Sequence, residues 1–235
     1  MSSKYGETWV YESIIGALPG ISISPTVALA IQLGAFEAAI LVLAWVYGLW
    51  TAAAAGTVAV VVATAGSAEM LRISRYARED GVPAGYRRLL FGTNVEVVLA
   101  VLAYIALITH LFVYDPQAAE DPIIEVLFGS DPPVLVVYLT LLVLWDVCYR
   151  IGTGWWASVV ALWRSARYRF DGDTRRTLRR ADLETLGFGL TQLVLVPFIQ
   201  AQPVLLAAVV GHVLAVTTVS GLAIVLLQVR GTDEN

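Results

Sequence analysis

Long apolar segments separated by short polar ones dominate this chain. Apolar residues fill the stretches 26–50, 51–71, 95–114, a fourth that follows the Pro132–Pro133 pair, 185–200 and 203–229. Several of them reach the roughly 20 residues that cross a hydrocarbon core of about 30 Å. The pattern predicts an all-α fold, a polytopic membrane bundle of six transmembrane helices over residues 26–230, followed by a polar tail at 231–235.

Two further segments have an amphipathic pattern. In residues 1–25 the apolar side chains fall close to one helical face, which predicts an N-terminal interfacial segment and leaves a re-entrant segment as the alternative. The second segment, 155–170, follows Gly152 and Gly154 and has an apolar face with arginines beyond it. We expect the fourth span to bend at these glycines into an interfacial helix, with one continuous helix reaching into the cytoplasm as the alternative.

The composition supports the membrane assignment. Of the 235 residues 58% are hydrophobic and 14% are charged, whereas soluble domains carry about 25% charged residues. The single cysteine, Cys148, excludes a disulfide within the chain and a cysteine-based metal site.

Charge is unevenly distributed over the polar loops. Arginines gather in 72–88 and 164–180, whereas the loop 115–131 contains acidic residues and no basic one. Because positive loops stay inside, we expect a multi-pass protein of the cell (plasma) membrane with both termini cytoplasmic. The arginine-rich loops suit anionic lipid head groups as partners, nucleic acid is not expected, and a homo-oligomer is left open.

Four titratable residues are predicted to lie inside the bilayer and form a polar intramembrane site: Glu37, Asp146, Arg150 and His212. A charge there costs about 2.5–3.5 kcal/mol, so each usually has a partner or a function. Asp146 and Arg150 are spaced i, i+4 and can pair on one helix face. Either this pair is structural, or Glu37 competes for Arg150 and frees a carboxylate for a proton or cation. Secondary candidates are His110, Gln32 and Gln192.

Three classes of function fit these residues. The first is a small transporter or ion channel that uses the charged cluster. The second is an accessory, sensory or lipid-organising protein with a structural ion pair, and the third is a membrane enzyme or haem protein. We find no catalytic or metal-binding signature and expect no cofactor. Haem held by His110 and His212 is possible in principle, but the different depths of the two histidines disfavour it.

Overall fold

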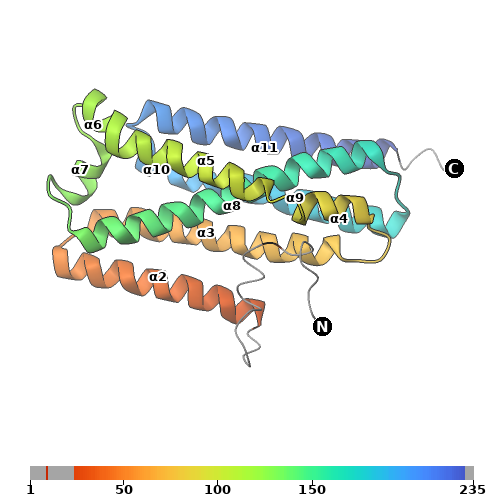
Figure 1. The fold of residues 1–235 in the computed structure, drawn as a ribbon, viewed down its shortest axis with the longest axis horizontal. Coiled ribbons are helices and arrows are strands. Elements are labelled where there is room, and N and C mark those ends of the chain that lie inside the picture. Colours follow the sequence, from red (N-terminus) through yellow and green to blue (C-terminus); the bar gives the residue numbers. More distant parts are fainter. Residues whose placement is uncertain (1–8, 10–23, 231–235) are drawn as a thin grey trace.

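Long helices that run along a common axis build the molecule (Figure 1). This computed structural model describes Trp9 and residues 24–230. Within them, six helices are long and apolar enough to cross a membrane, which confirms the predicted all-α membrane bundle. The interfacial segment expected for residues 1–25 falls almost entirely outside the described residues, as does the tail at 231–235.

The elements follow one another along the chain with short links. They are α2 (Pro25–Tyr47), α3 (Trp50–Ala77), α4 (Ala84–Phe91), α5 (Val95–Thr109), the π-helical turn η1 (His110–Tyr114), α6 (Asp115–Ala118), α7 (Ile123–Phe128), α8 (Val134–Arg167), α9 (Gly172–Thr191), the 3₁₀ turn η2 (Gln192–Leu195), α10 (Val196–Ile199) and α11 (Pro203–Val229). One candidate span comprises α4, α5, η1 and α6, and another comprises α9, η2 and α10.

The first helical hairpin is defined by its caps. Ser24 accepts a hydrogen bond from the N–H of Val27 at 3.3 Å, and Pro25 occupies the first helical turn, so α2 begins there. Gly48 ends α2 with φ +74°, a left-handed conformation that glycine adopts without a steric penalty. The chain therefore reverses within two residues, and α3 runs back along α2.

α8 is the central helix and packs against α2, α3, α4, α5, α9 and α11. It is one helix over its 34 residues, so the separate interfacial helix predicted over 155–170 is wrong and the alternative of an uninterrupted helix is correct. The two glycines serve close packing instead. A Cβ on Gly152 would lie 3.0 Å from the backbone nitrogen of Ala100 on α5, and one on Gly154 would lie 3.3 Å from the ring of Phe188 on α9.

The longest helices exceed the thickness of a hydrocarbon layer. At about 1.5 Å per residue α8 is about 50 Å long, against about 30 Å of hydrocarbon. The remainder forms a head with α4 and the adjoining ends of α3 and α9 (Figure 1). For this reason α9 begins at Gly172, well before the predicted start of the fifth span at 185.

Asp171 caps α9 at the entry to this head. Its side chain accepts hydrogen bonds from the N–H groups of Asp173 and Thr174 and from the Thr174 hydroxyl. These bonds stabilise the carboxylate and so hold the pKa of Asp171 below its usual value. The bond from the Thr174 N–H has the largest effect.

Two apolar cores lie along the axis. The core of the head and the adjoining membrane region includes Met70, Ile73, Tyr86, Leu90, Phe91, Val160 and Leu178. The other core joins α2, α3 and α8 and comprises Ile40, Ala44, Ala53, Val60, Ala63, Val143 and Val147.

Candidate functional site

A hydrogen-bonded network joins α2, α3 and α8 inside the bundle. Asp146 and Arg150 form the ion pair that their spacing predicts, with 2.8 Å between Oδ1 and Nη2. Gln32 donates from Nε2 to the other carboxylate oxygen of Asp146 at 2.6 Å. Ser67 donates to the amide oxygen of Gln32 at 2.9 Å. These four residues are called the polar latch below.

Arg150 is deeply embedded, with 2% of its surface exposed. Gly66 on α3 makes room for its stem, because a Cβ at Gly66 would lie 2.6 Å from the Arg150 Cβ. At the other end of the side chain, Nη1 lies 3.2 Å from the sulfur of Met70, and the guanidinium lies 5.2 Å from the centre of the Tyr149 ring. The stem and the charge are therefore both enclosed by protein.

Glu37 does not join the latch. Thr57 on α3 donates a hydrogen bond of 2.8 Å to its Oε1, and among the described residues no ion pair connects Glu37 with Arg150. The other oxygen, Oε2, is buried and has no hydrogen-bond partner among the described residues. The competition for Arg150 considered from the sequence is absent from this arrangement of helices.

The two histidines occupy separate surroundings. His212 on α11 packs against Trp155 of α8, with ring centroids 6.2 Å apart, and its Nε2 has no hydrogen-bond partner in Trp9 or residues 24–230. His110 stacks on Tyr114 at 5.3 Å and lines an open pocket of about 370 Å³ beside the start of α11 at Pro203. Because His212 lies nine residues further along α11, about 13 Å, the geometry gives no support to a haem bound by both. Gln192, the remaining candidate, is buried in η2.

The head contains a second buried ion pair that the sequence analysis missed. Arg164 on α8 donates from Nη2 to both carboxylate oxygens of Asp182 on α9, each at 2.7 Å. It also donates to the Tyr86 hydroxyl and to the carbonyl oxygen of Leu178, both at 3.1 Å. From the sequence, the arginine-rich stretch 164–180 is interpreted only as a marker of membrane orientation and a contact for lipid head groups. The signal that reveals the pair is the helical spacing of Leu178, Ala181 and Asp182, which share the buried face of α9.

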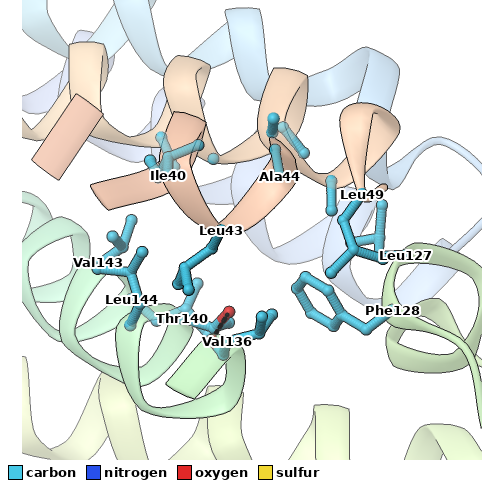
Figure 2. A pocket seen from close by; sticks show the side chains of 16 residues that line it. Ile40, Leu43, Ala44, Leu49, Leu127, Phe128, Val136, Thr140, Val143 and Leu144 are labelled. Atoms are coloured by element: carbon cyan, nitrogen blue, oxygen red, sulfur yellow. Dashed lines mark hydrogen bonds between the residues drawn. The ribbon is translucent and has the colours of Figure 1, made fainter. Parts of the chain in front are cut away.

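An apolar groove lies at the opposite end, where α2, α3, α7 and α8 meet. Figure 2 shows side chains from these helices around it, including Ile40 and Leu43 of α2 and Phe128 of α7. Its volume is about 140 Å³. The side chains that line it are hydrocarbon apart from that of Thr140. The Thr140 hydroxyl donates a hydrogen bond to the Val136 carbonyl oxygen within α8 at 2.8 Å.

The chain was compared with known proteins and protein families. Neither the curated proteins nor the solved structures gave a match. A family model described as "Family of unknown function (DUF7530)" matches residues 4–223. The match covers most of the 235 residues, so the chain belongs to this family.

Proposed function

We propose that this multi-pass membrane protein is a lipid-binding accessory protein, whose intramembrane charges hold its helices together. The observation that carries the proposal is the apolar groove between α2, α3, α7 and α8. The polar latch supports it. Asp146 already accepts hydrogen bonds from both Gln32 and Arg150, so its charge is satisfied by contacts that stabilise the helix bundle.

The occupant that suits the groove is an acyl chain of a bilayer lipid. Apolar cavities of about 150 Å³ stay dry and take apolar guests, and this groove has a similar volume of about 140 Å³. The same helices expose large apolar side chains beside it, such as Trp45 at 76% and Leu135 at 60% exposure. In a membrane these side chains face lipid acyl chains, so an acyl chain lies next to the groove and can enter it.

Photocrosslinking tests this proposal. The protein is reconstituted in vesicles of phosphatidylglycerol with a diazirine in its acyl chain, irradiated and mapped by mass spectrometry. We expect adducts on Leu43 and Leu127, which line the groove. Ala52→Phe fills the groove and lowers this labelling, whereas the control Ala54→Phe adds the same bulk at an exposed position and leaves it unchanged. Equal labelling of both variants contradicts the proposal.

For the orientation, we propose the cell membrane with the head in the cytoplasm. The arginine-rich segments 72–88 and 164–180 lie in and around the head, and α6 and α7 with the acidic loop lie at the other end (Figure 1). Positive charge favours the inner side, where it also meets anionic lipid head groups. A cysteine placed in the loop 115–131 should then react with an impermeant maleimide added outside intact cells.

Transport through the bundle is the second candidate. The unpartnered Oε2 of Glu37 and Nε2 of His212 favour it, since unsatisfied polar atoms inside a membrane often belong to ion paths. Proteoliposomes separate the two functions. A transporter gives sodium, potassium or proton flux that Asp146→Asn and Glu37→Gln abolish, whereas a lipid-binding protein gives no flux above protein-free vesicles.

A further inference from the structure

Glu69 on α3 is a buried carboxyl that the polar latch does not use. Only 1% of its surface is exposed, and within the part of the chain that the structure describes neither of its side-chain oxygens has a hydrogen-bond partner by geometry. A lone carboxylate in such surroundings loses its hydration without compensation, which disfavours the charged form. The carboxylic acid form avoids most of that loss.

The surroundings of Glu69 come from three helices. On α8, Gly154 leaves space beside it, since a Cβ there would lie 3.7 Å from Oε2 of Glu69. On α9, the ring of Phe188 packs on the same glycine. The Thr185 hydroxyl also lies near, but its hydrogen bond is to the Ala181 carbonyl oxygen at 3.3 Å. The enclosure formed by these three helices is therefore small and mostly apolar, and Thr185 supplies a polar side chain beside the carboxyl.

The charges that face Glu69 do not neutralise it. From α3 comes Arg72, one turn away, and from α9 comes Glu184, and these two residues form an ion pair with each other. Glu184 also accepts a hydrogen bond from Tyr76 at 3.0 Å. On α8, the guanidinium of Arg150 is directed to Asp146 and to the Met70 sulfur. Among the residues that the structure describes, Glu69 therefore has no ion-pair partner of its own.

The depth of Glu69 places it within reach of protons from the head side. Its neighbour Gly154 lies twenty residues along α8 from Val134, which is about 30 Å and so close to the inner edge of the hydrocarbon layer. The Arg72 side chain, one turn further along α3, is 44% exposed. A small separation of α3 from α9 at the Arg72–Glu184 pair would admit water to the carboxyl.

We propose that Glu69 is a proton-binding site, which holds one proton while α3, α8 and α9 are packed and releases it to water on the head side when they separate. In the release step the carboxyl O–H bond breaks, the proton passes to water, and the carboxylate becomes hydrated. Packing of the three helices is thereby linked to proton concentration. This inference does not depend on the apolar groove.

Infrared spectroscopy of the reconstituted protein tests the site. At neutral pH the wild type should show the carbonyl band of a protonated carboxyl, and Glu69→Gln should remove one component of it. The amide is close in shape to the neutral acid, so this variant is expected to fold. The matched control Glu125→Gln, at an exposed carboxylate of α7, should leave the band unchanged.

Thermal unfolding gives a second readout. As the pH rises from mildly acid values through neutral, the wild type should lose stability, because the unfolded chain releases the Glu69 proton in this range while the packed enclosure must keep it or hold a bare charge. Glu69→Gln should show a smaller loss over the same range. A wild type without a protonated-carboxyl band at neutral pH overturns the proposal without any variant, as does a band that Glu69→Gln leaves intact.

Discussion

Gln32 on α2 and Asp146 on α8 are joined by a hydrogen bond of 2.6 Å, from the amide Nε2 to the carboxylate Oδ2. α2 lies at the edge of the bundle beside α3, and α8 lies at its centre (Figure 1). Ser67 closes the link from α3. The edge helix is thus tied to the centre by polar bonds in one region and bounds the apolar groove in another.

Removal of the Gln32 amide should loosen α2. Gln32→Ala deletes a hydrogen bond to a charged acceptor, a class worth about 1.5–3 kcal/mol. It also leaves the Ser67 hydroxyl, which is buried, without its acceptor on α2. Thermal unfolding in detergent should show a lowered midpoint, whereas Gln117→Ala at an exposed position should not change it. Equal midpoints for the two variants would show that the latch does not hold α2.

A double-mutant cycle measures the ion pair of the latch. Arg150→Ala leaves Asp146 without its counter-ion and should cost about 3–5 kcal/mol, the range for breaking a buried pair from one side. Arg150→Ala combined with Asp146→Ala removes both charges and should recover much of that loss. The measurement is the free energy of unfolding of all four proteins under one condition. A double variant no more stable than Arg150→Ala contradicts an architectural role for the pair.

The spans and the i, i+4 ion pair were predictable from sequence because each depends on local constraints. Lipid imposes length and apolarity on any crossing helix, and the spacing of Asp146 and Arg150 puts them on one face whatever surrounds them. The partners of that pair were not predictable. Gln32 reaches Asp146, and Glu37 reaches Thr57, only through the packing of α2 on α3 and α8.

The glycines of α8 show a second limit of sequence reasoning. Gly152 and Gly154 suit a bend and suit close helix packing equally well, and only the neighbouring helices decide between the two. Here α5 packs against Gly152 and Phe188 packs against Gly154, and α8 continues through both glycines as one helix. Glu69 was missed for a related reason, because its burial depends on the same approach of α8 and α9 to α3.

The cap of α9 predicts a dependence of stability on acid pH. The folded state holds the pKa of Asp171 below its usual value, so the stability that this cap contributes is complete above the unfolded-state pKa. It is lost as the pH falls through the lower, folded-state pKa. Asp171→Asn retains a capping oxygen but does not titrate, so its unfolding midpoint should fall less steeply with acid than that of the wild type.

The control for this cap is Asp80→Asn, an exposed aspartate in the link between α3 and α4. Its acid profile should follow that of the wild type. If Asp171→Asn also follows the wild type through the acid range, the cap does not contribute the expected pH dependence.

Two ion pairs of the head should differ sharply in their contribution to stability. Asp182→Asn weakens the pairing of Arg164, whose side chain is wholly enclosed, and should cost about 3–5 kcal/mol because the guanidinium stays buried without its counter-charge. Asp173→Asn breaks the pair with Arg176, in which the side chains are 93% and 82% exposed, and should change stability by no more than about 0.5 kcal/mol. Chemical denaturation of both variants in one detergent makes the comparison. Similar costs for the two substitutions would contradict the burial of the Arg164–Asp182 pair and the packing of α8 on α9 that encloses it.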